Sequence, residues 1–258
     1  MSKNTVNIII DGVEIEAQEG QTILQAADDA GVYIPRLCYL KGLIPGGHCR
    51  VCTVKVNGRP ASSCTFPVSE GLVIENDTEE LTTLRRTVVE MLFAEGNHVC
   101  PACEASGNCE LQAMGYRLGM LAVTLPFLRK PRELDATHPD VFIDRDRCIL
   151  CGRCARASEA EGKRVFGFEG RGINKRIAVD GVHGLKETGL KAADRAAQAC
   201  PACEASGNCE LQAMGYRLGM LAVTLPFLRK PRELDATCLL YTSPSPRDRT
   251  RSRMPSSA

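Results

Sequence analysis

The stretch VNIIIDGVEI at residues 6–15 decides the fold class of the N-terminal part of this sequence. Two strand-forming runs flank Asp11-Gly12, a pair typical of tight hairpin turns because glycine adopts a positive φ at no steric cost. Further along, residues 51–56 and 59–64 flank an Asn-Gly turn and predict a second hairpin. The N-terminal part is therefore expected to contain a small sheet built from two hairpins.

Helices are expected between the hairpins and after them. Thr22 and Gln25 form a capping box, in which each side chain accepts a hydrogen bond from the other residue's backbone N–H, and Gly31 ends the helix. A longer helix is expected to start at Asp77 and Glu80. Its expected apolar residues are Leu81, Leu84, Val88, Met91 and Leu92. Two hairpins flanking one helix predict an α+β chain that begins with a β-grasp domain.

The composition bounds the class of protein. The 258 residues suffice for two or three small domains, and 44% hydrophobic with 24% charged residues is ordinary for a soluble globular protein. No run of about 18 apolar residues is present, and no secretory signal precedes the first strand. We therefore expect a cytoplasmic protein without a transmembrane segment. A formal net charge of +1 gives no electrostatic footprint for nucleic acid.

Fourteen cysteines dominate the chemistry of this sequence. In a reducing cytoplasm, they are expected to be ligands of a metal or cluster rather than disulfides. Soft thiolates suit iron–sulfur clusters, and short spacings let one loop wrap several ligands around a compact inorganic core. Three groups of residues have this character.

The first group is a set of four cysteines around a glycine-bearing loop. Its members are Cys38, Cys49, Cys52 and Cys64. Gly46 and Gly47 allow a close approach of the backbone and can aim N–H groups at the sulfurs. A 2Fe–2S cluster is favoured because the glycine loop lies within a β-grasp pattern, although the first spacing is wider than in plant-type ferredoxins. A structural zinc site is the alternative, and His48 is interpreted as a loop residue.

The second group combines one histidine with three cysteines. Its members are His98, Cys100, Cys103 and Cys109. Three thiolates and one imidazole can hold a 4Fe–4S cluster, and a neutral imidazole in place of a thiolate changes the net charge and the reduction potential. The alternative for His98 is an ordinary surface histidine at a helix end.

The third group opens with the spacing of a ferredoxin-type 4Fe–4S site, provided by Cys148, Cys151 and Cys154. The fourth ligand of such runs is often followed by proline. Cys200 precedes a proline, 45 residues separate it from Cys154, and we expect it to be the fourth ligand. The three groups then provide twelve ligands for one 2Fe–2S and two 4Fe–4S clusters. The cysteines left over are Cys203, Cys209 and Cys238.

An internal repeat limits the part of the chain that supports functional reasoning. Residues 100–137 and 200–237 are identical at every position, whereas natural repeats share a pattern and differ on their surfaces. Residues 203–258 are interpreted as an assembly artefact, a duplicate of residues 103–137 with an adaptor-like tail; a recent real duplication is the alternative. The expected 2Fe–2S β-grasp, small helical His/Cys3 4Fe–4S and ferredoxin-type 4Fe–4S domains occupy residues 1–77, 78–119 and 140–202.

The signatures of substrate-converting enzymes are missing. The sequence has no G-x-G-x-x-G motif after a strand, no P-loop, no H-E-x-x-H motif and no pairing of a nucleophile with a base. We therefore expect a chain that conducts electrons and has no catalytic residues of its own. A zinc-stabilised interaction module is the alternative from another class, and it predicts a colourless protein.

Three motifs together resemble a known family. They are PGGHCRVC at residues 45–52, GNHVCP at 96–101 and SGNCELQ at 106–112. They resemble the N-terminal iron–sulfur region of the large peripheral subunit of respiratory complex I, and more closely the diaphorase small (gamma) subunit of cytoplasmic NAD(P)-reducing hydrogenases. The resemblance covers residues 5 to about 201. A single residue between the histidine and the next cysteine fits the hydrogenase branch better than the usual three of complex I.

The resemblance implies cofactors and partners. It implies a 2Fe–2S cluster, a histidine-ligated 4Fe–4S cluster and a further 4Fe–4S cluster in sequence order. It also implies an NAD(P)H-oxidising flavoprotein (FMN) subunit and hydrogenase subunits as partners. The leading hypothesis is thus an electron-transfer subunit of an NAD(P)-linked hydrogenase. An N-terminal fragment of the complex I large subunit and a formate dehydrogenase diaphorase subunit are the alternatives.

Overall fold

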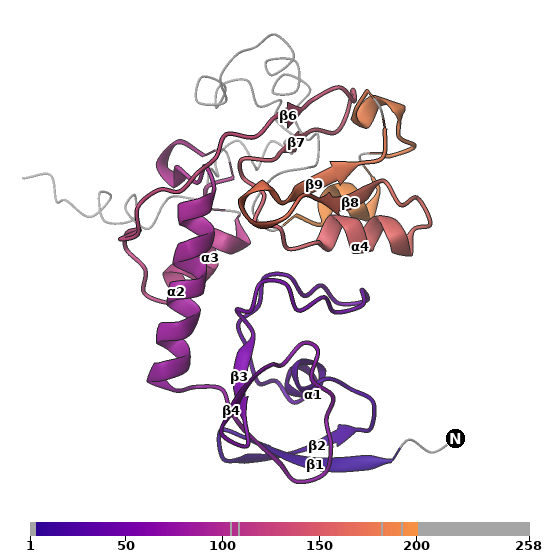
Figure 1. Cartoon of the computed structure of the whole chain (residues 1–258). Coiled ribbons are helices and arrows are strands. Elements are labelled where there is room, and N and C mark those ends of the chain that lie inside the picture. Colours follow the sequence, from indigo (N-terminus) through magenta and orange to yellow (C-terminus); the bar gives the residue numbers. More distant parts are fainter. Residues whose placement is uncertain (1–3, 104, 108, 182, 192, 201–258) are drawn as a thin grey trace, which may run out of the picture.

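The computed structural model describes residues 4–200, except residues 104, 108, 182 and 192 (Figure 1). Apart from Cys200, the second copy of the repeat, with Cys203 and Cys209, and the tail with Cys238 lie outside the described residues. The described part has an α+β fold, with a five-stranded sheet and two short hairpins alongside five α-helices. None of the helices in this part has the length and hydropathy that a membrane span requires.

The N-terminal sheet has the strand order β2-β1-β5-β3-β4. Its strands are β1 (Thr5–Ile10), β2 (Val13–Gln18), β3 (Thr53–Val56), β4 (Arg59–Ser62) and β5 (Leu72–Glu75). Both predicted hairpins are confirmed, because β1 pairs antiparallel with β2 and β3 pairs antiparallel with β4. Strand β5, which was not predicted from the sequence, joins the two hairpins by pairing parallel with β1 and antiparallel with β3.

The helix between the hairpins is α1 (Ile23–Asp29), and it packs on the sheet. The predicted capping box is confirmed: the Thr22 side chain accepts from Gln25 N, and the Gln25 side chain accepts from Thr22 N. The apolar side of α1 joins the buried side chains of the sheet, among them Ile8 and Ile10, in one core. This core holds the loop after α1, which carries the first cysteine, against the β3–β4 hairpin.

The long helix α2 (Glu79–Glu95) differs from the sequence prediction in its cap and its buried side. Thr78 caps it, and its side chain accepts a hydrogen bond from Leu81 N. Of the predicted apolar residues, Leu81 is buried and Val88 and Leu92 are partly buried, whereas Leu84 and Met91 are exposed. The helix also buries Arg85, Val89, Phe93 and Ala94. The prediction was therefore right for three of its five apolar residues, and it missed Arg85 because a charged residue carries no apolar signal of burial.

The rest of the described chain forms small elements beyond α2 (Figure 1). They are α3 (Glu110–Arg117), α4 (Arg153–Ala160), α5 (Arg195–Gln198), the hairpin of β6 (Leu134–Asp135) with β7 (Ile143–Asp144), and the hairpin of β8 (Phe166–Glu169) with β9 (Arg176–Val179). β6 and β7 thus lie between α3 and α4 in the chain. In Figure 1 the loop between α1 and β3 lies between the sheet and α4.

Candidate functional site

The first group of cysteines gathers at one end of the β3–β4 hairpin. Cys52 directly precedes β3 and Cys64 follows the end of β4, so antiparallel pairing brings them to the same end. The loop after α1 supplies Cys38 and Cys49, and the backbone N–H of Cys38 donates to Cys49 Sγ at 3.3 Å. All four thiols are buried. The structure thus brings together the four residues that the sequence predicted for this site.

The thiols of this group hydrogen-bond to one another, which shifts their pKa values in opposite directions. Hydrogen bonds from Cys49 and Cys64 lower the pKa of Cys38 to about 2, and a hydrogen bond from Cys64 lowers that of Cys52 to about 6. Cys49 and Cys64 are the donors, so their pKa values are raised, and burial raises them further. Four sulfurs within reach of one another, with two favouring the thiolate, match the donors that an iron–sulfur core needs.

The glycine-bearing loop makes room for the imidazole ring of His48, in addition to any N–H groups that it directs at the sulfurs. A Cβ on Gly46 would lie 2.4 Å from His48 Cδ2, so a side chain at this position would collide with the ring. On its other side, the His48 ring contacts the Phe168 ring, with centroids 5.7 Å apart. Burial lowers the pKa of His48. The structure therefore places His48 as a packing residue between the first group and the β8–β9 hairpin.

His98 is a buried imidazole with an unused nitrogen. Its Nε2 is buried and has no hydrogen-bond partner within the part of the chain that the structure describes. Burial, assisted by the nearby Arg147 charge, lowers the pKa of His98 to about 4, so the ring is neutral at pH 7. Gly96 makes space for the ring, because a Cβ there would lie 2.3 Å from Nε2, and Phe93 packs edge-on against it. A neutral, desolvated imidazole nitrogen is a suitable ligand for iron.

The three cysteines of the second group lie between α2 and α3. Cys100 opens a 3-10 turn (Cys100–Ala102), and Cys109 is the N-cap of α3. Burial raises the pKa values of both, while the backbone N–H groups of Gln112 and Leu111 act in the opposite direction on Cys109. The turn between them is held by Gln112, whose side chain accepts from Gly107 N at 2.7 Å and donates to Ser106 Oγ at 3.1 Å.

Arg147 contacts the second group and was missed by the sequence analysis. Its guanidinium donates to Cys103 Sγ at 3.8 Å and pairs with Asp144 at 3.1 Å. Arg147 is buried although it immediately precedes the first cysteine of the third group. A positive charge beside a thiolate stabilises the negative form of the sulfur. No local pattern in the sequence could have shown that this arginine serves the preceding group.

The third group assembles from two distant segments. Cys148, Cys151 and Cys154 line one apolar cavity together with Cys200, the fourth residue predicted from the sequence. Burial, followed by the neighbouring Cys200 charge, raises the pKa of Cys148 to about 12, and the same causes raise that of Cys151. Burial also raises the pKa of Cys154, and the neighbouring charges of Cys148 and Cys200 raise it further. The structure therefore brings Cys200 to the other three cysteines.

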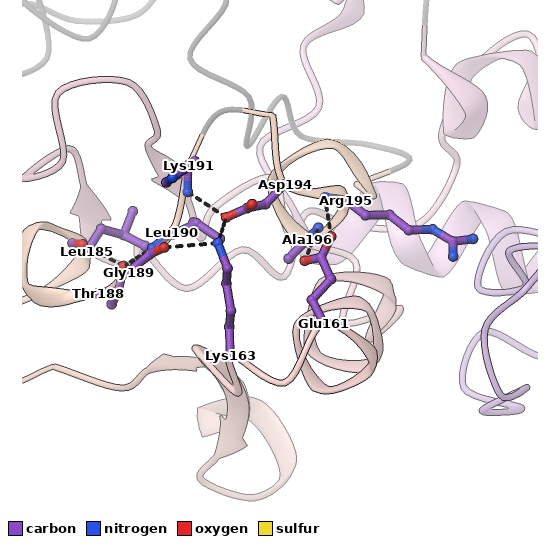
Figure 2. A network of polar contacts seen from close by, with 10 residues as sticks. All are labelled: Glu161, Lys163, Leu185, Thr188, Gly189, Leu190, Lys191, Asp194, Arg195 and Ala196. Atoms are coloured by element: carbon purple, nitrogen blue, oxygen red, sulfur yellow. Dashed lines mark hydrogen bonds and ion pairs between the residues drawn. The ribbon is translucent and has the colours of Figure 1, made fainter.

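A polar network anchors the segment that delivers Cys200 (Figure 2). Lys163 donates to Gly189 O at 3.0 Å and pairs with Asp194, whose carboxylate also accepts from Lys191 N at 2.6 Å. Glu161, just after α4, accepts from Arg195 N at 2.7 Å, so its carboxylate satisfies the start of α5. Cys200 follows the end of α5 by two residues, and its position thus depends on this network.

One apolar cluster, which we name the central core, touches all three groups. It includes the buried thiols of Cys38, Cys49 and Cys151, and the partly buried thiols of Cys100 and Cys109 pack against it. The other buried members of the central core are Leu37, Val51, Val89, Phe93, Leu111, Met114, Leu118 and Ile149. The three groups are therefore neighbours around a shared interior rather than separate sites on a string of domains.

The donor chemistry of these groups fits iron–sulfur clusters. Among the described residues, no set of three or more His, Cys, Asp or Glu side chains is spaced to hold a single metal ion. Thiolates and a neutral imidazole are ligand types that iron–sulfur clusters take. Within the described residues, the Nε2 of His98 has no hydrogen-bond partner and the thiols of the third group line a cavity, so both are available to a cluster.

Family models match the chain in three regions. Residues 3–79 match a 2Fe-2S iron-sulfur cluster binding domain. Residues 85–123, and again 197–223, match the NADH-ubiquinone oxidoreductase-G iron-sulfur binding region. Residues 141–203 match a 4Fe-4S single cluster domain. The chain therefore contains binding domains for both 2Fe–2S and 4Fe–4S clusters.

Known relatives define the family. The gamma subunit of the NAD-reducing hydrogenase HoxS of Cupriavidus necator is 45% identical over 178 residues, which are 68% of this chain and 76% of that subunit. The chain belongs to this family. A chain of an NAD+-reducing [NiFe]-hydrogenase, solved in the H2-reduced state, superimposes with a TM-score of 0.74 at 47% identity, over 76% of this chain and 85% of that one.

The hydrogenase gamma subunit family has longer relatives. The 78 kDa subunit of NADH-ubiquinone oxidoreductase of Candida albicans is 36% identical over 67% of this chain and 25% of its own length. The alpha subunit of NADPH-Fe(3+) oxidoreductase of Geobacter sulfurreducens is 36% identical over 58% of this chain and 18% of its own length. The chain thus spans a quarter or less of these two proteins. As a member of the gamma subunit family, it is an iron–sulfur electron-transfer subunit of an oxidoreductase complex.

Proposed function

We propose that this chain relays electrons between an NAD(P)H-oxidising FMN flavoprotein subunit and a hydrogenase subunit in the cytoplasm. The proposed ligands of one 2Fe–2S cluster are Cys38, Cys49, Cys52 and Cys64. The proposed ligands of two 4Fe–4S clusters are His98, Cys100, Cys103 and Cys109 for one, and Cys148, Cys151, Cys154 and Cys200 for the other. The five-stranded sheet with α1 is then a β-grasp domain at residues 1–77, followed by cluster domains at 78–119 and 140–202.

The observation that carries this proposal is the central core shared by the three groups. Thiols of all three border it, so the groups are close to one another and shielded from water. A chain that only stabilised itself with metal would gain nothing from such adjacency, whereas a relay depends on it. The 45% identity to a subunit of an NAD-reducing hydrogenase supports the same function.

The side chains around the groups prepare each site for its cluster. When bound, an iron–sulfur cluster accepts and donates one electron at a time. The chain keeps His98 neutral by burial, so its Nε2 is free to ligate. Arg147 donates to Cys103 and supplies positive charge beside the sulfur. The apolar side chains of the central core exclude water from between the groups.

A complex I type subunit is the second candidate. The 36% identity to the 78 kDa subunit of NADH-ubiquinone oxidoreductase favours it, although the greater coverage of the hydrogenase gamma subunit favours the hydrogenase. Both candidates share the same three groups of ligands. They differ in the subunits that must accompany this chain.

Affinity purification of the tagged chain from its native cell separates the two candidates. We expect a flavoprotein subunit and hydrogenase subunits to copurify, and the reduced iron–sulfur signals to appear in electron paramagnetic resonance (EPR) spectra after addition of either H2 or NADH. Copurification of quinone oxidoreductase subunits, with a response to NADH and none to H2, would favour the second candidate. A colourless preparation that contains zinc and lacks iron would contradict both.

A further inference from the structure

Arg156 connects two segments that are far apart in the sequence. It lies in α4, two residues after Cys154, and its Nη2 donates to Cys38 O at 2.5 Å and to Cys151 O at 3.2 Å. Its Nη1 donates to Ile44 O at 2.7 Å. One guanidinium therefore joins backbone carbonyls of the first cysteine group to a carbonyl of the third.

The geometry of this junction depends on the forked shape of arginine. The Nε of Arg156 also donates to Gly152 O at 3.1 Å, so all three nitrogens of the guanidinium donate to backbone carbonyls. A lysine ammonium is a compact charge on a flexible stem and cannot span two segments in one fixed plane. The four hydrogen bonds thus fix both the distance and the orientation of the two loops.

The junction is tightly packed on both sides of the guanidinium. A Cβ on Gly46 would lie 3.3 Å from Arg156 Nε, and a Cβ on Gly152 would lie 3.2 Å from the ring of His48. The loop that carries Cys49 and the loop that carries Cys151 therefore meet around the side chains of His48 and Arg156. A shift of one loop would have to move the other.

The charge of Arg156 is not neutralised locally. Within the part of the chain that the structure describes, no carboxylate pairs with it, and its acceptors are carbonyls. By contrast, Arg153 on the same helix makes a two-pronged ion pair with Glu110, at 2.6 and 2.7 Å. A full positive charge consequently remains between the first and third groups.

We propose that Arg156 is a positioning residue that holds the first and third cysteine groups at one fixed separation and makes the clusters at both groups easier to reduce. The proposal rests on the proposed function, because it requires clusters at these two groups. Positioning follows from the four hydrogen bonds to both loops. Easier reduction follows because a nearby cation stabilises an added negative charge.

The test uses the full chain, purified anaerobically, with two variants that separate shape from charge. Arg156→Gln removes both the charge and the fork, whereas Arg156→Lys keeps the charge and removes the fork. Arg59→Gln is the matched control, because it removes one exposed charge from β4. For each protein, iron content, the midpoint potentials of the two clusters and the magnetic coupling between their reduced EPR signals are measured.

We expect Arg156→Gln to shift the reduced-to-oxidised ratio of both clusters about tenfold toward the oxidised form at a given potential, which is about 59 mV for one electron. Its magnetic coupling should also weaken. Arg156→Lys should keep both potentials and lose the coupling, and Arg59→Gln should change neither. If Arg156→Gln does not bind iron, the magnetic coupling measured in Arg156→Lys tests the proposal by itself.

Native potentials and native coupling in an iron-replete Arg156→Gln protein would overturn the proposal, and so would native coupling in Arg156→Lys. A wild-type chain without iron–sulfur signals would instead contradict the proposed function. The two failures are therefore distinguishable in one set of spectra.

Discussion

His98 illustrates at the residue scale how burial prepares a ligand. The ring is surrounded by Gly96 and Phe93, and the loss of water lowers its pKa to about 4. An exposed histidine would be partly protonated near neutral pH, and protons would then compete with the metal for its ring nitrogen. The buried ring is instead neutral, and its Nε2 has no hydrogen-bond partner among the described residues.

Replacement of His98 tests its role as a ligand. We expect His98→Ala to lose about four iron atoms per chain, because three thiols remain at the second group. His98→Cys should keep the iron and lower the midpoint potential, since a thiolate adds negative charge. His183→Ala is the control, because the His183 side chain is 66% exposed. A full complement of iron in His98→Ala would contradict ligation by this residue.

Replacement of Cys200 tests whether this residue is the fourth ligand of the third group. Cys200 lines one cavity with three other thiols of that group, so Cys200→Ser should lose the EPR signal of that cluster and about four iron atoms. The matched variant is Cys203→Ser, three residues further along, which should retain both. The opposite result, with loss only in Cys203→Ser, would show that Cys203 and not Cys200 is the fourth ligand.

At the scale of elements, a buried arginine joins α2 to the sheet. The guanidinium of Arg85 donates to Thr53 O at 2.9 Å, to Asn76 O at 2.9 Å and to Asn76 Oδ1 at 2.8 Å. Burial lowers the pKa of Arg85, and its bonds satisfy acceptors next to β3 and β5. This joint sets the direction in which α2 leaves the sheet toward the second cysteine group.

Loss of this joint should destabilise the chain. Arg85→Met leaves buried carbonyl oxygens without donors, and we expect the free energy of unfolding to fall by about 3 kcal/mol. Arg59→Met, at an exposed position, should change it by less than about 0.5 kcal/mol. Urea denaturation of the metal-free proteins measures both values. Equal midpoints for the two variants would show that α2 is held by apolar contacts alone.

The anchor of the Cys200 segment is also an element-scale device, and it depends on pH. The hydrogen bond from Lys163 lowers the pKa of Asp194, so the folded state favours the charged carboxylate. Its contribution to stability is therefore present above the unfolded pKa and is lost as pH falls through the folded one.

Hydrogen exchange can detect this anchor. In Asp194→Asn, the amides of residues 195–199 should exchange faster at pH 7, while those of β1 stay protected. At a pH below the normal pKa range of an aspartate, these amides should also exchange faster in the wild type, and the variant should change little. Unchanged exchange in Asp194→Asn would show that the contacts of Asp194 with Lys163 and Lys191 (Figure 2) do not hold the segment that precedes Cys200.

At the scale of the whole molecule, the sequence predicted the turns and the grouping of the cysteines better than it predicted the packing. Spacing and turn residues were enough for both hairpins, for the capping box at Thr22 and for the grouping of Cys200 with the third site, because these signals are local or follow from ligand count. The roles of Arg85, Arg147 and Arg156 were not predictable. Each acts on a segment distant in sequence, and a charged residue carries no periodic sign of burial.

Three adjacent clusters in one chain form the central claim, and the iron and acid-labile sulfide content of the anaerobically purified chain tests it most directly. We predict about ten iron atoms per chain, with EPR signals of one 2Fe–2S and two 4Fe–4S clusters after reduction. The same result is expected for a chain that ends at residue 202. A protein that contains zinc and no iron would contradict the account.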